Sequence, residues 1–94
     1  MIIGVCTLEL HLPEALSLKD KRSILKSLLS RLHQQFNVSA AETDDHDLWQ
    51  SAVIGVAVVS NSTRHAQEVI NHIVRWIEIT YPQVQIVRQS TELL

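Results

Sequence analysis

The residues with the clearest chemical meaning form a basic cluster in the stretch SLKDKRSILKSLLSRL, which begins at Ser17. Lysine and arginine recur there against a single acid, Asp20, although the chain as a whole has a formal net charge of -2. Cationic groups gathered on one surface suit phosphate, because each neutralised phosphate releases counterions. The sequence therefore predicts a site for an anion or for RNA phosphate at Lys19, Lys21, Arg22 and Lys26.

A helix through this stretch would not present the four residues alike. At 100° per residue, Lys19, Arg22 and Lys26 share one stripe with His33, to the side of the leucine stripe. The alternative is a solvated helix face, because lysine and arginine are good helix formers at exposed positions. Lys21 falls within the apolar arc, so either its stem passes the end of the sheet to reach water or the residue is placed for a ligand. Basic charge at a helix start also opposes the helix dipole.

A second polar cluster, TDDHDLW, brings Asp44, Asp45, His46 and Asp47 together. Carboxylates beside a histidine can bind a divalent metal. The spacing matches no established metal-binding loop and lacks the glycine that an EF-hand requires. Aspartate side chains bond to their own backbone and favour turns. We therefore predict an acidic turn and no metal.

Catalysis has little support in the sequence. The only cysteine, Cys6, lies in the middle of a predicted strand on its core side, where an apolar environment would keep the thiol protonated and inert. There is no evident pair of nucleophile and base, no glycine-rich phosphate loop and no cofactor motif. The sequence predicts a protein that is not an enzyme and that holds no cofactor.

Composition sets the class of protein. A chain of 94 residues with 46% hydrophobic residues predicts one globular domain, 1–94, and excludes disorder. A single cysteine cannot form an intrachain disulfide. The longest apolar run, AVIGVAVV, is too short to span a bilayer, and the start MIIGVCTLEL lacks the basic region of a signal peptide. These features predict a cytoplasmic protein that does not associate with a membrane.

The pattern of apolar residues predicts the elements that must position these side chains. Period-two alternation and buried runs indicate strands, and apolar residues at three- and four-residue spacing after serine caps indicate two helices. The order is β-α-β-β-α-β, which predicts an α+β, ferredoxin-like two-layer sandwich with a four-stranded antiparallel sheet and both helices on one face. The predicted strands are 2–12, 37–43, 48–60 and 84–89. The first predicted helix is 18–36, after the Ser17 cap, and the second runs from the cap signal at 61–63 to Tyr81.

The third predicted strand is apolar on both of its faces. Such strands are usually covered on both sides, whereas the two helices can cover only one. Contiguous apolar surface commonly marks an interface. The sequence therefore predicts a homo-oligomer that associates through the open sheet face, at Ile3, Val5, Trp49, Val53 and Val59.

Several segments, in order and spacing, resemble the YlxP-like family: SLKDKRSILKSLLSRL, FNVSAAE, DLWQSAVIGVAVVSN and PQVQIV. This is a family of small uncharacterised bacterial proteins with a ferredoxin-like fold and no assigned activity. Family genes often adjoin those for ribosome maturation and translation initiation, so the resemblance implies a ribosomal or RNA context. The family pattern implies an apolar residue at position 43, where this chain has Thr43. We therefore expect a looser end to the second strand.

Two hypotheses of function remain open. The first is a non-enzymatic binding protein for RNA or a ribosomal particle. The second is a homo-oligomeric interaction or regulatory module without a nucleic-acid role. Salt separates them, because binding to phosphate weakens steeply as salt rises and apolar association does not.

Overall fold

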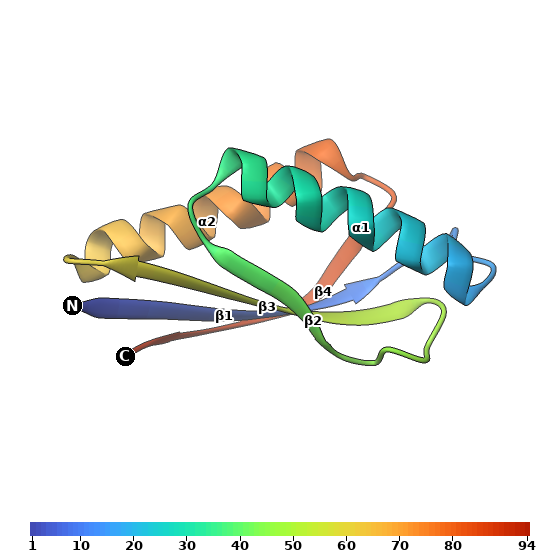
Figure 1. Ribbon diagram of the computed structural model, residues 1–94, viewed down its shortest axis with the longest axis horizontal. Helices are drawn as coiled ribbons and strands as arrows, with labels where there is room; N and C mark the ends of the chain where they lie inside the picture. Colours follow the sequence, from blue (N-terminus) through green and yellow to red (C-terminus); the bar gives the residue numbers. More distant parts are fainter.

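The computed structural model describes the whole chain, residues 1–94, as two helices on one face of a four-stranded antiparallel sheet (Figure 1). The strands lie in the order β2-β3-β1-β4. The predicted ferredoxin-like order β-α-β-β-α-β is therefore confirmed. The elements are β1 (Ile2–His11), α1 (Leu18–Gln35), β2 (Ser39–Asp44), β3 (Ser51–Ser60), α2 (Thr63–Thr80) and β4 (Gln85–Leu93).

Both helices begin at the serine caps that the sequence predicts. Ser17 Oγ accepts a hydrogen bond from the Asp20 backbone N–H at 3.1 Å, and the Asp20 carboxylate accepts one from the Leu16 N–H at 3.0 Å. Ser62 Oγ accepts a bond from the His65 N–H in the same way. These contacts satisfy amides that the first turn of a helix leaves without partners. The helix starts are thus fixed locally, independently of packing.

The register of the sheet decides which side chains form the core. β1 pairs with β3 without interruption from Ile2 opposite Ser60 to His11 opposite Ser51. Cross-strand partners point to the same face, so alternate residues of both strands meet under the helices. The fully buried residues on that face and on the helices include Cys6, Leu8, Leu10, Ile54, Val56, Leu28, Leu32, Ile70, Ile73 and Ile77. Burying each of the larger side chains contributes about 1.5–3 kcal/mol.

Two strand boundaries differ from the prediction. β3 begins at Ser51, so Trp49 lies in the loop before it and not on the strand. β4 extends to Leu93 and is longer than predicted, because its last residues are polar and mostly exposed and carry no apolar alternation. Pairing with β1 makes this segment a strand, and that pairing is invisible in the local sequence.

Thr43 occupies a defined place on the open face of the sheet. The ladder between β2 and β3 shifts register between Glu42 and Asp44, so Thr43 lies at an irregularity. A Cβ added to Gly55 would come within 3.0 Å of Thr43 Cγ2, so the threonine methyl fills the space that a side chain at residue 55 would take. The register shift places Thr43 at an irregularity within β2, which extends to Asp44, and a looser end of this strand stays a prediction.

We expect Gly55→Ala to destabilise the protein by about 1 kcal/mol or more, because its methyl would clash with Thr43 at a fixed strand position. Thr43→Ser removes the methyl that clashes, so the double variant should recover most of that loss. Chemical denaturation of the wild type and the three variants measures the effect. Equal losses in Gly55→Ala with and without Thr43→Ser would contradict the assigned contact.

Candidate nucleic-acid interface

Three of the four predicted anion-binding residues lie on the exposed side of α1. Lys19, Arg22 and Lys26 are all exposed, and no carboxylate lies within ion-pair distance of any of them. With a rise of about 1.5 Å per residue they extend over about 10 Å of the helix. We call these three residues the basic stripe.

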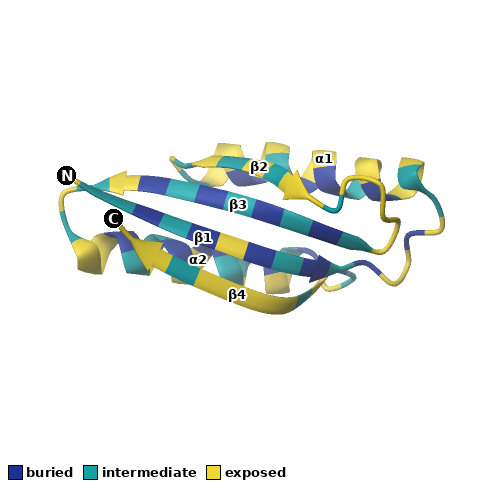
Figure 2. Cartoon of the chain, turned by 90° about the horizontal axis from the view of Figure 1, so that it is seen from below, coloured by how far each residue is buried: buried dark blue, intermediate teal, exposed yellow.

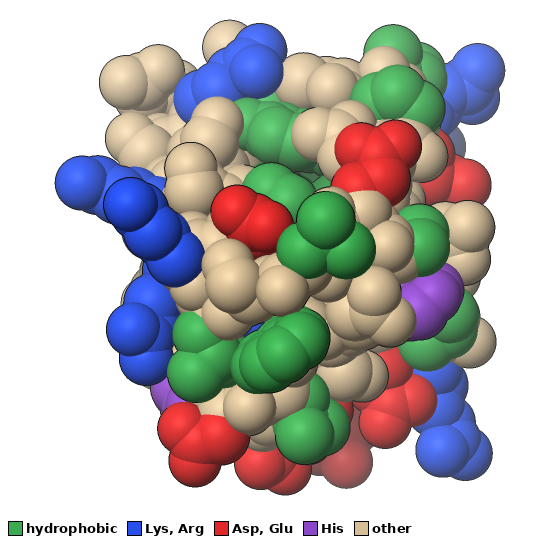
Figure 3. All heavy atoms as spheres, turned by 90° about the vertical axis from the view of Figure 1, so that its right-hand side faces the viewer, with side chains coloured by type: hydrophobic (Ala, Val, Ile, Leu, Met, Phe, Trp, Pro, Cys, Tyr) green, Lys and Arg blue, Asp and Glu red, His purple; other side chains and the backbone are tan.

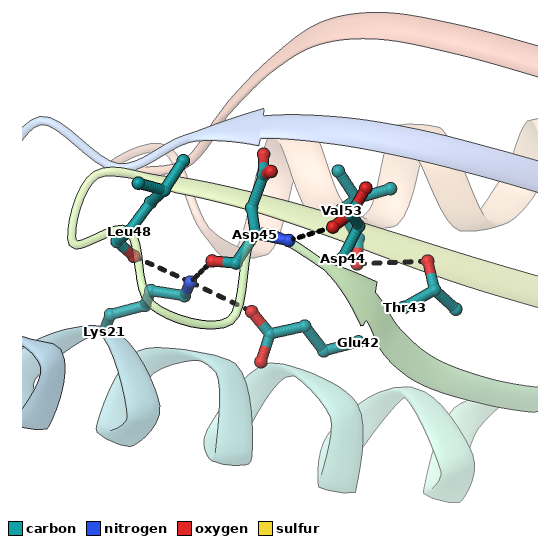
Figure 4. Close-up of polar contacts among 7 residues, drawn as sticks. All are labelled: Lys21, Glu42, Thr43, Asp44, Asp45, Leu48 and Val53. Carbon is teal, nitrogen blue, oxygen red and sulfur yellow. Dashed lines mark hydrogen bonds and ion pairs between the residues drawn. The ribbon is translucent and has the colours of Figure 1, made fainter.

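The fourth residue, Lys21, has a different environment. Its side chain is fully buried, and its Nζ donates to the backbone carbonyl oxygens of Asp45 and, at 2.7 Å, Leu48 (Figure 4). The same nitrogen lies 3.0 Å from Glu42 Oε2. That contact is an ion pair without a hydrogen bond, since no N–H or O–H donor is aligned on this oxygen. We call Lys21, Glu42, Asp45 and Leu48 the Lys21 cluster.

The prediction that Lys21 binds an external anion is corrected by this geometry. The ammonium group donates hydrogen bonds to the carbonyl oxygens of Asp45 and Leu48, and the Glu42 carboxylate pairs with its charge, so groups of the protein itself surround it. A charge removed from water must be paired and hydrogen-bonded, which the cluster achieves. The Lys21 side chain does not reach water past the end of the sheet, and its ammonium group is not exposed to an external ligand. It ties the first turn of α1 to the segment that joins β2 and β3.

The acidic segment forms the turn that receives this lysine. Asp45 has φ of 60°, in the left-handed region that aspartate tolerates better than most residues, and its N–H donates to Asp44 Oδ1 at 2.8 Å. The Leu48 N–H donates to the Asp45 carbonyl at 3.1 Å. No three histidine, cysteine or acidic side chains come together here or elsewhere in a group that could hold a metal ion. The backbone of this turn thus supplies oxygens, and it supplies them to Lys21.

Arg31 and His33 of α1 belong neither to the basic stripe nor to the Lys21 cluster. Arg31 lies over the ring of Tyr81, with the guanidinium carbon 5.4 Å from the ring centroid, and Ser27 shares a hydrogen bond of 2.8 Å with the Tyr81 hydroxyl. His33 is exposed. Figure 3, which views the end of the molecule at the right of Figure 1, shows several lysine and arginine side chains along one side and others at the opposite side, with acidic side chains along the lower edge and nearer the middle. Positive charge is therefore local, on a chain of net negative charge.

Cys6 lies where the sequence places it. The thiol is buried on the helix side of β1, and burial raises its pKa, while a hydrogen bond with Thr91 acts in the opposite direction. A thiol with a raised pKa is mostly protonated near neutral pH and therefore a poor nucleophile.

Four of the five predicted interface residues share one sheet face, but the five do not form one patch. Ile3 is directly opposite Val59, and Val5 is the next residue of β1 on that face, so these three lie together. Val53 is opposite Glu9, towards the other end of β3, and six residues of strand span about 20 Å. Trp49 lies beyond Val53 in the loop. Figure 2 shows this face as a mixture of half-buried and exposed positions.

The comparison with known proteins follows the same division between a clear fold and an open function. Residues 3–91 match the model of a family described as "Protein of unknown function (DUF503)". The chain belongs to the DUF503 family. This DUF503 protein is 33% identical over 91 residues to the uncharacterized protein YlxP of Bacillus subtilis (strain 168), covering 97% of this chain and 98% of that protein. The resemblance to the YlxP-like family is thereby confirmed.

Solved structures similar to the DUF503 chain agree on its fold alone. A de novo designed protein with a ferredoxin fold, LFR1, is 14% identical and aligns over 100% of this chain and 83% of its own, with a TM-score of 0.55. A putative chlorite dismutase is 17% identical and aligns over 99% of this chain and 44% of its own, with a TM-score of 0.50. Neither helix of the DUF503 protein is long and apolar enough to cross a membrane.

Proposed function

We propose that this DUF503 protein is a non-enzymatic binding protein that contacts RNA, alone or within a ribosomal particle, through the basic stripe of α1. The observation that carries the proposal is the state of Lys19, Arg22 and Lys26. All three are exposed on one side of a single helix, and none is paired with a carboxylate. Their charge is available to phosphate oxygens at no cost in broken ion pairs.

The contacts of nearby acids support the proposal, because they leave these acids engaged away from the basic stripe. Asp20, the only acid inside the stretch, is engaged in the helix cap with Ser17 and Leu16. Glu42 is engaged by Lys21. Asp20 and Glu42 are thus engaged by the backbone and by the buried lysine, and no acid lies within ion-pair distance of the basic stripe. The helix is also held firmly at the end where the stripe begins.

The test is the dependence of RNA binding on salt. Three phosphate contacts to a single strand predict a slope of log affinity against log salt of about −2, which is a loss of roughly twentyfold between 50 and 200 mM salt. Each single reversal, Lys19→Glu, Arg22→Glu or Lys26→Glu, should weaken binding and bring the slope closer to zero by about 0.7. Fluorescence anisotropy with a labelled single-stranded RNA measures both quantities.

Arg75→Glu is the matched control, because Arg75 is an exposed arginine on α2 and its reversal changes the net charge by the same amount. This variant should bind with the slope of the wild type. Co-sedimentation with ribosomal subunits at low salt tests the particle itself. Failure of the wild type to bind either RNA or subunits at 50 mM salt, or equal binding by the stripe variants, would refute the proposal.

A second candidate function, a homo-oligomeric interaction module, is favoured by one observation. Val59 is 65% exposed on the open sheet face, directly opposite Ile3, and the backbone of Ile3 pairs with that of the exposed Leu94. Apolar side chains of β1, of β3 and of the residue after β4 thus meet at one end of this face. Association through this end needs no nucleic acid.

A further inference from the structure

β4 is a terminal strand whose outer edge has no neighbour. It is nine residues long, lies last in the order β2-β3-β1-β4, and is exposed along most of its length (Figure 2). Such an edge is a template for another strand unless it is short, interrupted or like-charged. The opposite edge strand, β2, has six residues and carries Glu42 and Asp44. β4 contains no proline and no lysine. Its pairing with β1 is regular from Arg88 to Leu93 and shifts register between Arg88 and Ile86, so the regular part of the edge is Arg88 to Leu93.

The pairing with β1 shows which backbone groups of β4 face outward. Leu94 and Ile3 exchange two hydrogen bonds, of 2.8 and 3.0 Å. Antiparallel pairs alternate between hydrogen-bonded and non-bonded, so Glu92, Ser90 and Arg88 also direct their backbone groups to β1. Thr91 and Gln89 then direct both N–H and C=O away from the sheet. These outward groups are available to a strand added at the edge.

The side chains of β4 are arranged symmetrically about its centre. Reading outward from Ser90, the two directions give Gln89 and Thr91, then Arg88 and Glu92, then Val87 and Leu93. An antiparallel copy centred on Ser90 therefore places arginine opposite glutamate twice within the regular part of the strand, whereas Val87 lies at the register shift and is not counted as a pair with Leu93. Opposite charges directly across strands are stabilising.

We propose that β4 is a self-complementary edge through which two copies of this protein join antiparallel, on a two-fold axis at Ser90, into one continuous sheet. Gln89 of each copy then faces Thr91 of the other, and these outward residues exchange about four backbone hydrogen bonds. Arg88 faces Glu92 of the second copy in the closer, non-bonded type of pair. An isologous contact of this kind closes at a dimer.

Neighbouring registers are less favourable for the side chains. A centre at Gln89 places Arg88 opposite Ser90, and a centre at Thr91 places Glu92 opposite Ser90, so both lose the ion pairs. The existing partner of Arg88 is no obstacle, because the Arg88–Glu9 contact is 4.0 Å long and joins exposed side chains. Exposed pairs of this kind are weak. The register centred on Ser90 is thus selected by charge.

The surroundings of β4 fit the same contact. A groove of about 490 Å³ lies between α2 and β4 and is lined by residues of α2, including the exposed Ile79, and by Gln89 of β4. A second strand along the outer edge of β4 would close the open side of this groove. α1 lies over β2 at the other side of the sheet, so the basic stripes of both copies stay accessible. The inference keeps the second candidate function, a homo-oligomeric module, but places its interface at the edge of β4 and not at the open sheet face, and it does not depend on RNA binding.

The experiment is a charge swap read by sedimentation equilibrium of the full chain. We expect the wild type to be a dimer. Arg88→Glu or Glu92→Arg alone should raise the dissociation constant of the dimer about tenfold or more, because two attractive pairs become repulsive. The double variant Arg88→Glu/Glu92→Arg restores opposite charges and should return the dissociation constant to near that of the wild type.

Two further variants separate the possible failures. Lys26→Glu makes the same charge change as Arg88→Glu on α1 and should leave the dimer intact, even where it weakens RNA binding. Val59→Lys tests the open sheet face. A wild type that is monomeric at high concentration, a double variant that stays dissociated while folded by circular dichroism, or dissociation by Val59→Lys with no effect of Arg88→Glu would overturn the edge interface.

Discussion

Lys21→Ala is expected to lower the free energy of unfolding by about 3–5 kcal/mol, the cost typical of removing one partner from a buried ion pair. The Lys21 side chain is fully buried, and the Glu42 side chain is only 18% exposed. Removing the ammonium leaves that carboxylate without its cation and leaves the carbonyls of Asp45 and Leu48 without this donor. Urea denaturation followed by circular dichroism measures the loss.

Companion variants separate charge from packing. Lys21→Met keeps most of the buried volume, so the difference between Met and Ala reports the cavity. Glu42→Gln removes the charge but keeps an oxygen near Lys21, and we expect a smaller loss than for Lys21→Ala. Lys19→Ala is the surface control and should change stability by less than about 0.5 kcal/mol. A Lys21→Ala variant as stable as Lys19→Ala would contradict the buried cluster.

Leu28→Ala is expected to cost about 3–5 kcal/mol, because Leu28 is fully buried at the centre of α1 and its removal leaves a cavity under the helix. Leu29→Ala is the matched control. The same deletion is made one residue away, at a half-buried position, and should cost clearly less. Denaturation curves with unchanged slopes would show that both variants remain folded in the native form. Equal losses would mean that α1 is turned differently on the sheet.

The fold could be predicted from the sequence because its signals are local. Ser17 and Ser62 cap the helices through hydrogen bonds to the backbone N–H three residues later. The alternation of apolar residues in β1 matches its alternation of buried side chains. β4 was less predictable because pairing with β1, and not its own composition, makes Ser90 to Leu93 a strand. The prediction placed Trp49 on the strand because apolar residues already begin at Leu48, before the first paired residue of β3.

The candidate site was predictable only in part. Exposure of Lys19, Arg22 and Lys26 follows from helical periodicity, since they lie off the leucine stripe. The same periodicity marks Lys21 as anomalous, in line with Leu25, Leu28 and Leu32. It cannot name the partners, because they come from β2 and the turn after it and depend on how that turn is placed over α1. Two of them are backbone oxygens, which carry no signal in the sequence.

The long reach of the Lys21 cluster has a consequence for the lifetime of the folded chain. Lys21 lies 24 and 27 residues before the carbonyls that it binds, so the contact requires both a docked α1 and a finished β2–β3 connection. Interactions that form after the rate-limiting step of folding act on the rate of unfolding and hardly on the rate of folding. We infer that the Lys21 cluster forms after the rate-limiting step of folding, and that its main kinetic effect is to slow unfolding.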